Sequence, residues 1–245
     1  MIISVDIEGG GWYNVFNCEM KARTKMSFEN KKAIIFDLDG TLADTIDAIA
    51  EAVNMTLEHF GYPTKTVDEV RRAVGNGARM IIRRTIPSEF YDDEETVSRV
   101  LAKYDEMYAL TYTHSDRMYD GMREALIELH NSGKKIAVFS NKQDAYVKGL
   151  SDIYFSDGTI SMALGQTELP VKPDIAGLLL IMNELGVTAD ECVFVGDSGV
   201  DLATAKNANM DCICVSWGFV GREGLLAKGA ECIIDHPSEL VTLIP

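Results

Sequence analysis

Short runs of apolar residues, rich in β-branched and aromatic side chains, recur along most of the chain. Each run ends at small or polar residues, and the apolar positions within it are continuous rather than alternating. This pattern is typical of strands that are buried on both faces of a parallel sheet. The clearest runs lie at residues 33–36, 136–139, 193–195 and 212–215, and weaker ones at residues 160–164 and 232–234.

Helical patterns separate most of these runs. Apolar residues at three- and four-residue spacing occupy residues 122–129 and 175–185. Gly133 and Gly186 stand where these two helices are expected to end. The alternation of strands and helices predicts an α/β fold, a doubly wound, Rossmann-like core built on a parallel sheet.

The interval between the first two runs is too long for a single crossover. Residues 37–134 make 98 residues, whereas a strand–helix–strand unit needs about 30 in total. Apolar residues trace one helical face at residues 46–60 and another at residues 97–108. We therefore predict a helical domain inserted after the first strand, with hinges near residues 43–45 and 116–119.

These hinges divide the chain into three predicted parts. Residues 33–44 and 117–245 form the α/β core domain, and residues 45–116 form the helical insertion. Residues 1–32 form an N-terminal extension that carries no motif and is expected to be poorly ordered. A docked strand at residues 1–7 is the alternative for this extension.

Composition and charge narrow the classes of partner. The chain carries 38 acidic and 23 basic residues, a net charge of −15, which disfavours nucleic acid and anionic membranes as partners. No apolar run approaches the roughly 20 residues that span a bilayer, and the N-terminal segment lacks a secretory signal pattern. The five cysteines are expected to be reduced thiols. A cytoplasmic protein is predicted.

The first predicted strand runs directly into Asp37-Leu38-Asp39-Gly40-Thr41. Two carboxylates at positions i and i+2, leaving a buried strand for a glycine turn, are costly unless a cation lies between them. A plain Asp-Gly turn is the structural alternative.

Three further polar segments follow predicted strands. Ser140-Asn141 stands where a helix is expected to begin, Lys172-Pro173 precedes another helix with Pro173 as its first residue, and Gly196-Asp197 is followed by Asp201. Each alone could be a helix cap or a surface lysine. Together they fall at the carboxyl edge of one sheet, where open α/β sheets bind ligands. Acids for a divalent cation, with a lysine, hydroxyl and amide for an anion, meet the needs of phosphoryl transfer.

In this order, the four segments resemble the motifs of the haloacid dehalogenase superfamily, most of whose members are phosphatases. The resemblance covers residues 33 to about 242. Within the superfamily the chain looks like the phosphoglycolate phosphatase-like branch, and the helical insertion resembles its cap domain of type C1. The segments that carry this closer likeness are residues 195–208, 217–219, 229–230 and 236–240.

The resemblance implies a role for each motif residue. Asp37 resembles the nucleophile that forms an aspartyl-phosphate, and Asp39 resembles the general acid and then base. Asp197 resembles a Mg²⁺ ligand that completes a site with the Asp37 carboxylate and the Asp39 backbone carbonyl. Asp201 belongs to the same metal site, either as a ligand or behind the ligands. The residues that resemble the phosphate clamp are Thr41, Ser140 and Lys172, and Asn141 lies beside the clamp among the expected phosphate- or substrate-binding residues.

The segment from Val74 to Ala78 lies between two helical patterns of the insertion and resembles the family's specificity loop. Gly75 and Gly77, on either side of Asn76, would let backbone amides approach a ligand closely. Arg71, Arg72 and Arg79 lie nearby in sequence. We expect this loop to bind the leaving group of a small phosphorylated metabolite, such as the carboxylate of phosphoglycolate. An inter-helix turn with solvated arginines is the alternative.

The sequence departs from the family's pattern in four places. Ile175 replaces a common proline, Val220 replaces a common arginine, and Tyr119-Asp120-Gly121 replaces the commoner Pro-Gly. Asn209 stands where a glycine is usual, and asparagine can also adopt the left-handed conformation. None of these positions belongs to the four motifs.

The sequence thus predicts a Mg²⁺-dependent phosphomonoester hydrolase that acts through an aspartyl-phosphate. A phosphosugar mutase or a pyrophosphatase on the same scaffold is an alternative, as is a non-catalytic phosphate-binding protein. Loss of Asp37 or Asp39 would favour the last of these, and both are present. A dehalogenase is disfavoured because Asp39 supplies an acid that carbon–halogen chemistry does not require. The physiological substrate and the oligomeric state stay open.

Overall fold

The computed structural model describes residues 28–114 and 117–245. Residues 1–27, with Cys18 and the alternative strand at residues 1–7, lie outside the described residues. So does Asp116 at the second predicted hinge. Phe28 is buried against the core, and its amide donates to the carbonyl of Leu243. The packed part of the chain therefore includes residues that the sequence analysis assigned to the extension.

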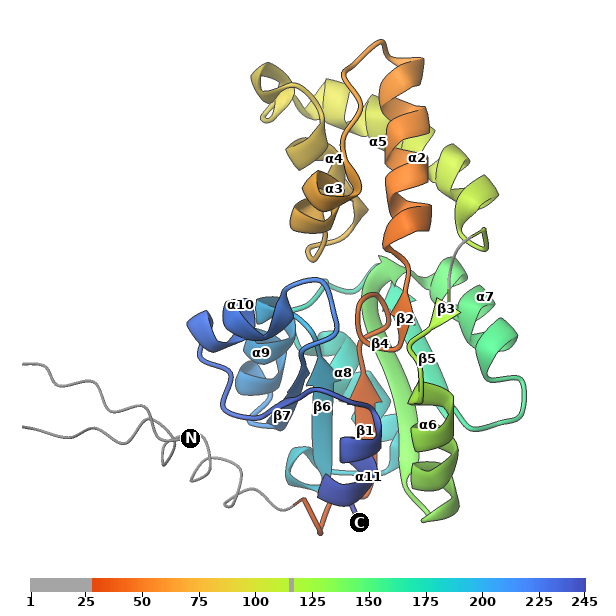
Figure 1. Ribbon diagram of the computed structural model, residues 1–245, viewed down its shortest axis with the longest axis vertical. Coiled ribbons are helices and arrows are strands. Elements are labelled where there is room, and N and C mark those ends of the chain that lie inside the picture. The colour runs from red at the N-terminus through yellow and green to blue at the C-terminus, as the bar shows by residue number, and fades with distance from the viewer. Residues whose placement is uncertain (1–27, 115–116) are drawn as a thin grey trace, which may run out of the picture.

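A six-stranded parallel sheet forms the core, in the order β5-β4-β1-β6-β7-β8 (Figure 1). The first strand in sequence lies in the middle, where Ala33 pairs with Lys135 on one side and Cys192 on the other. All four residues of this strand are buried, as its continuous apolar run predicts. The strands are β1 (Ala33–Phe36), β4 (Lys135–Gln143), β5 (Met162–Gln166), β6 (Cys192–Gly196), β7 (Asp211–Val215) and β8 (Ile233–Ile234).

Helices cover both faces of this sheet, which confirms the doubly wound fold. Alternate residues of β1 contribute to two separate hydrophobic clusters: Ile34 and Phe36 face α6, α7 and α11, while Ala33 and Ile35 face α8 and α9. The helices of the core are α6 (Met122–Asn131), α7 (Asp144–Tyr154), α8 (Ala176–Leu185), α9 (Gly199–Asn207), α10 (Gly221–Ala227) and α11 (Ser238–Leu243).

The inserted helices lie beyond the carboxyl edge of the sheet (Figure 1). They enclose a hydrophobic cluster of their own, in which Val53 and Leu57 of α2 join Val97 and Val100 of α5. This confirms the inserted helical cap, while the exact boundaries at residues 44/45 and 116/117 stay a prediction. The helices are α2 (Ile46–His59), α3 (Val67–Ala73), α4 (Ala78–Thr85) and α5 (Glu94–Thr111).

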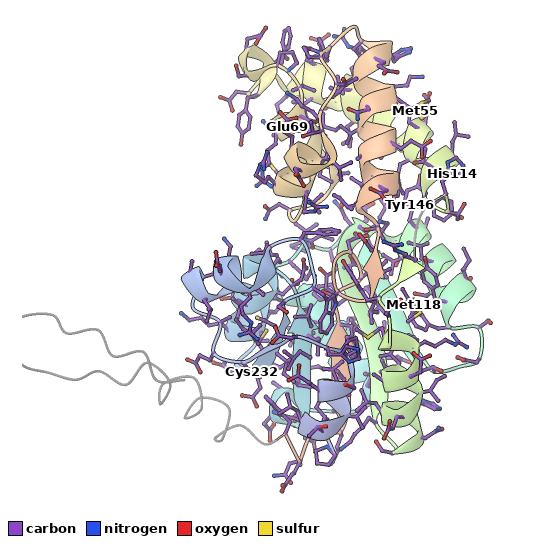
Figure 2. The ribbon with its side chains drawn as sticks, in the orientation of Figure 1. Met55, Glu69, His114, Met118, Tyr146 and Cys232 are labelled. Atoms are coloured by element: carbon purple, nitrogen blue, oxygen red, sulfur yellow. The ribbon has the colours of Figure 1, made fainter. Side chains whose placement is uncertain are left out.

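Two short antiparallel strands connect the insertion to the core, β2 (Ala43–Asp44) and β3 (Arg117–Met118). Sequence analysis placed hinges here but no strands. Side chains from both parts meet at this junction, and Tyr146 of α7 is among them (Figure 2).

Two predicted helix starts are wrong. The chain continues as strand through Gln143, so α7 begins at Asp144 rather than directly after Asn141. The helix after Lys172-Pro173 begins at Ala176, because residues 171–174 form a turn and the Asp174 carboxylate accepts the Ala176 amide. Pro173 is therefore not the first helical residue.

Other local expectations are confirmed. Gly186 ends α8 with a φ of 64°, and Asn209 adopts a left-handed φ of 51°. The cysteines at 192, 212, 214 and 232 are free thiols. Within the described part of the chain, no helix is long and apolar enough to cross a membrane.

Candidate active site

The carboxyl edge of the sheet and the inserted helices line an open cavity of about 940 Å³. Nine of the eleven residues predicted for the site line it, from strand ends far apart in sequence and from the insertion. These are Asp37, Asp39, Gly75, Asn76, Gly77, Ser140, Asn141, Lys172 and Asp197. The remaining two, Thr41 and Asp201, are fully buried behind this wall.

Asp37 stands at the end of the central strand. Its Oδ1 accepts the Leu38 amide at 2.7 Å and lies 2.9 Å from Nζ of Lys172. Among the described residues, no hydrogen bond to its Oδ2 is recorded, so that oxygen is available to a ligand.

Lys172 is nearly fully buried and binds a second carboxylate, with Nζ 2.7 Å from Oδ1 of Asp201. Burial alone would lower the pKa of Lys172, but Asp201 and Asp37 together raise it above its ordinary value. The other oxygen of Asp201 accepts the amide and hydroxyl of Ser198, at 3.0 and 2.6 Å, and so caps α9. Both oxygens of Asp201 therefore have protein partners.

Asp197 follows β6 and is also buried. Its Oδ2 accepts the Phe219 amide at 2.6 Å, and its Oδ1 lies 3.5 Å from the Thr41 hydroxyl. Gly218 allows this approach, since a Cβ there would overlap both the Asp197 side chain and the Gly40 carbonyl. Burial, and then repulsion from Asp201 and Asp37, raises the pKa of Asp197 well above its usual range.

The carboxylates of Asp37, Asp197 and Asp201 form one cluster, with an oxygen of each within 4.8 Å of the others. Among the residues that the structure describes, Lys172 is the one cation that pairs with them, so full ionisation leaves two surplus negative charges. Burial, and then repulsion from Asp201 and Asp39, raises the pKa of Asp37 to about 7 although Lys172 lowers it. Oxygen ligands, burial and a deficit of two positive charges fit a divalent metal ion such as Mg²⁺.

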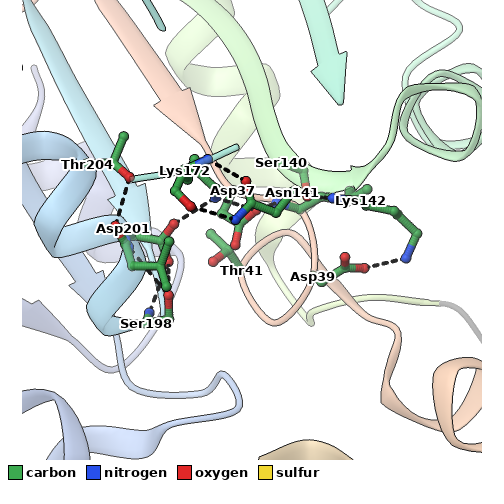
Figure 3. Close-up of polar contacts among 12 residues, drawn as sticks. Asp37, Asp39, Thr41, Ser140, Asn141, Lys142, Lys172, Ser198, Asp201 and Thr204 are labelled. Carbon is green, nitrogen blue, oxygen red and sulfur yellow. Dashed lines mark hydrogen bonds and ion pairs between the residues drawn. The ribbon is translucent and has the colours of Figure 1, made fainter. Parts of the chain in front are cut away.

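Asp39 turns away from this cluster toward a different cation (Figure 3). Its Oδ1 lies 2.6 Å from Nζ of Lys142 and accepts the Thr45 hydroxyl at 2.7 Å. Sequence reasoning did not identify Lys142. Lys142 directly follows Ser140-Asn141, but its direction depends on the strand continuing past its expected end, which the sequence pattern did not predict.

Asn141 and Thr41 each make contacts within the protein that the sequence analysis did not predict. The side-chain amide of Asn141 holds the Lys172 backbone at both ends, donating to its carbonyl at 3.0 Å and accepting its amide at 2.7 Å. Asn141 therefore positions Lys172. Thr41 contacts Asp197 instead of lining the cavity. Direct phosphate binding by either residue stays a prediction.

The loop from Val74 to Ala78 reaches the site from the insertion. Gly75 and Gly77 adopt φ values of +127° and +81°, which L side chains rarely adopt. The Gly75 carbonyl accepts the Asn141 amide at 3.4 Å, so the loop touches the sheet.

The arginines near this loop divide into two groups. Arg71 and Arg72 line the cavity as expected, together with Arg84, which sequence reasoning did not identify. Arg84 braces the loop by donating to Ala73 O and Asn76 Oδ1, both at 2.8 Å. Arg79 lies outside the cavity wall, because its guanidinium binds Glu94 and Ser98 of α5.

The chain is similar to known hydrolases. Residues 34–215 match the family model described as haloacid dehalogenase-like hydrolase. Phosphoglycolate phosphatase 1 of Pseudomonas aeruginosa is 31% identical over 214 residues, which are 86% of this chain and 78% of that relative.

Solved structures show the same likeness. One from Lactobacillus delbrueckii subsp. bulgaricus, provisionally assigned as a phosphoglycolate phosphatase, is 30% identical with a TM-score of 0.82, and the match covers 89% of this chain and 99% of that one. CbbY from Rhodobacter sphaeroides, solved in complex with phosphate, is 25% identical with a TM-score of 0.70, and the match covers 86% of this chain and 96% of that one.

Proposed function

Because the chain belongs to the haloacid dehalogenase-like hydrolase family, we propose that it is a Mg²⁺-dependent phosphomonoesterase that works through an aspartyl-phosphate on Asp37. One observation carries the proposal: Asp37, Asp197 and Asp201 meet around Lys172 at the wall of a cavity. Phosphatase activity is also the activity for which the curated relative is named.

The residues that would hold Mg²⁺ are the carboxylates of Asp37 and Asp197 with the backbone carbonyl of Asp39. Asp201 lies behind them, since both of its oxygens are occupied by Lys172 and Ser198. When bound, the ion neutralises the surplus carboxylate charge and draws electron density from the phosphoryl oxygens.

In the first step, Oδ2 of Asp37 attacks phosphorus. The bond between phosphorus and the leaving oxygen breaks, and the Asp39 carboxyl gives its proton to that oxygen. Lys172 and the Ser140 hydroxyl face the phosphoryl oxygens from the same wall of the cavity. Their positive charge and donor hydrogen stabilise the negative charge that develops there.

In the second step, a water molecule attacks the aspartyl-phosphate. The Asp39 carboxylate takes a proton from this water, the new oxygen–phosphorus bond forms, and the bond between phosphorus and Asp37 breaks. Inorganic phosphate then leaves, and both aspartates return to their starting state. The nucleophile and the general acid and base must both reach the substrate, and the Asp37 and Asp39 side chains both line the cavity.

The charges around the cavity favour an anionic substrate. Six cationic and four acidic residues line it, in a chain whose net charge is −15. A phosphomonoester whose leaving group carries a carboxylate, such as 2-phosphoglycolate, suits Arg71, Arg72 and the amides of the loop. The cationic residues are Arg71, Arg72, Arg84, Lys142, Lys172 and Lys228, and the acidic ones are Asp37, Asp39, Asp105 and Asp197.

The test is phosphate release from a panel of phosphorylated metabolites, with and without Mg²⁺. We expect Mg²⁺-dependent release of one phosphate per substrate consumed, and a phosphoenzyme that acid quenching traps on Asp37. Asp37→Asn should abolish both, while its circular dichroism matches the parent. A mutase would instead return the phosphoryl group to a second substrate hydroxyl. Turnover that persists in Asp37→Asn, or in excess chelator, contradicts the proposal.

A further inference from the structure

Separate lysines bind the two aspartates of the Asp37-x-Asp39 segment. Lys172 contacts Asp37, and Lys142 contacts Asp39 (Figure 3). Both lysine side chains are nearly buried, with 2% and 6% of their surface exposed. Removing an ammonium group from water is costly even when it is paired. A second buried lysine at this edge of the sheet therefore points to a role in the reaction.

The contacts of Asp39 orient its carboxyl group. Lys142 and Thr45 both bind Oδ1, at 2.6 and 2.7 Å. Within the described residues, no hydrogen bond to Oδ2 is recorded. Two donors on one oxygen restrain the rotation of the carboxyl group, so Oδ2 is the oxygen left to exchange a proton with the substrate.

Lys142 also contacts an aromatic ring from the insertion. Its Nζ lies 4.7 Å from the centre of the Tyr108 ring on α5, a distance typical of cation–π contacts. That ring is buried, stacks on Tyr104 at 5.6 Å, and meets the edge of Tyr146 from α7 at 4.9 Å. Lys142 thus touches the insertion on one side and Asp39 on the other.

We propose that Lys142 is a positioning residue, which holds Oδ2 of Asp39 toward the leaving-group oxygen and couples that orientation to the placement of α5. The inference rests on the proposed function, in which Asp39 protonates the leaving group. A poor leaving group such as an alkoxide depends strongly on this proton, whereas a nitrophenolate departs with little need of it. Loss of Lys142 should therefore harm alkyl phosphates selectively.

The experiment compares 2-phosphoglycolate with 4-nitrophenyl phosphate in Lys142→Met, which keeps most of the side chain and removes the charge. We expect kcat/KM for the alkyl substrate to fall about 100-fold and for the aryl substrate less than about 5-fold, with both KM values within about 3-fold of the parent. Lys142→Arg should restore part of the alkyl activity. Lys148→Met, at an exposed lysine that pairs with Asp144, is the matched control and should change neither constant.

Equal losses for both substrates, or no loss for either, overturn the positioning role. If Lys142→Met does not fold, the same two substrates are compared in Tyr108→Leu, which removes the ring that contacts Lys142. A loss confined to the alkyl substrate supports the positioning role of Lys142, and an equal loss for both substrates overturns it. The proposed function fails by a different result, in which the parent hydrolyses neither substrate or Asp37→Asn retains turnover.

Discussion

Asp37 lies in a buried cluster with more carboxylates than cations, and this affects both its reactivity and the stability of the fold. Its carboxyl group shares one ammonium with Asp201 while Asp197 lies within the same cluster. The resulting pKa of about 7 exceeds the ordinary value of 3.8. Without metal, the Asp37 carboxyl group therefore keeps its proton to a much higher pH than an exposed aspartate does.

A pH dependence of stability follows from the raised pKa of Asp37. Because the folded state binds this proton more tightly than the unfolded state, the free energy of unfolding of the metal-free protein should fall as pH rises from about 4 to 7. Asp37→Asn removes this loss, so the variant should be more stable than the parent by about 1 to 3 kcal/mol at pH 8 but not at pH 4. Urea titrations in chelator at both pH values measure the difference. A parent whose stability rises through this window contradicts the assignment.

Replacement of Gly218 is expected to lower both turnover and stability. A methyl group there meets the Asp197 side chain and the Gly40 carbonyl, so Gly218→Ala should displace a proposed metal ligand. We expect turnover to fall at least about 100-fold and stability to drop by about 2 to 4 kcal/mol. Gly221→Ala is the control, since it adds the same methyl group at a site where no atom lies within 4 Å, although the φ of 71° at Gly221 itself disfavours alanine. It should cost about 1 kcal/mol and leave turnover nearly intact. Similar kinetics in both variants would show that close packing at Gly218 is unimportant.

At the scale of elements, the buried strands were the most predictable part of the fold. A strand such as β1, covered on both faces, must be apolar at every position, and this leaves a continuous run in the sequence. The strands β2 and β3 have two residues each and leave no such pattern, because only their tertiary proximity pairs them. The start of α8 was misplaced because the turn before it depends on the Asp174 side chain.

The candidate site divides in the same way. Asp37 and Asp197 could be predicted because acids at the carboxyl ends of strands in one sheet converge. Lys172 lies in the loop after β5, where Asn141 holds its backbone, and its place in the site was expected from the likeness of Lys172-Pro173 to a family motif. The Phe219 contact to Asp197 uses a backbone amide, which any residue type supplies and which therefore leaves no mark in the sequence. The role of Lys142 could not be predicted, because the sequence analysis expected a helix to begin at Asn141. The Lys142 side chain reaches Asp39 only because the strand continues to Gln143.

The hydrogen bonds by which Arg84 holds the loop at residues 74–78 give a further prediction. Arg84→Met removes donors to Ala73 O and Asn76 Oδ1, so the loop should lose its fixed shape. KM for the preferred metabolite should rise about 10-fold, while constants for 4-nitrophenyl phosphate change less than about 3-fold. Arg79→Met is the matched control, because that guanidinium binds Glu94 and Ser98 away from the cavity. If Arg79→Met has the larger effect, the loop is not held as described.

At the scale of the whole molecule, metal binding should stabilise the fold. A ligand present at about 100 times its dissociation constant adds about 2.7 kcal/mol, which raises the melting temperature of a chain of this size by about 5 to 10 °C. We expect Mg²⁺ to produce this rise and chelator to reverse it. Asp197→Asn should lose most of the rise, while Asp152→Asn, at an exposed acid on α7, should keep it. Calorimetry of the parent and of the two variants measures the rise in melting temperature. An equal rise in all three proteins would show that the ion binds elsewhere.

The order of the strands in the sheet also determines when the protein can fold during its synthesis. The central strand β1 leaves the ribosome first but pairs with β4 and β6, whose partners for Ala33 are Lys135 and Cys192. The inserted helices contact one another locally, so they can close their own core while β1 still lacks both neighbours. Their closure brings β2 beside β3 and shortens the loop that β1 must close to reach β4. Both edges of β1 are therefore open until β4 has been translated, and the edge that pairs with β6 stays open to other nascent chains until residues 192–196 follow.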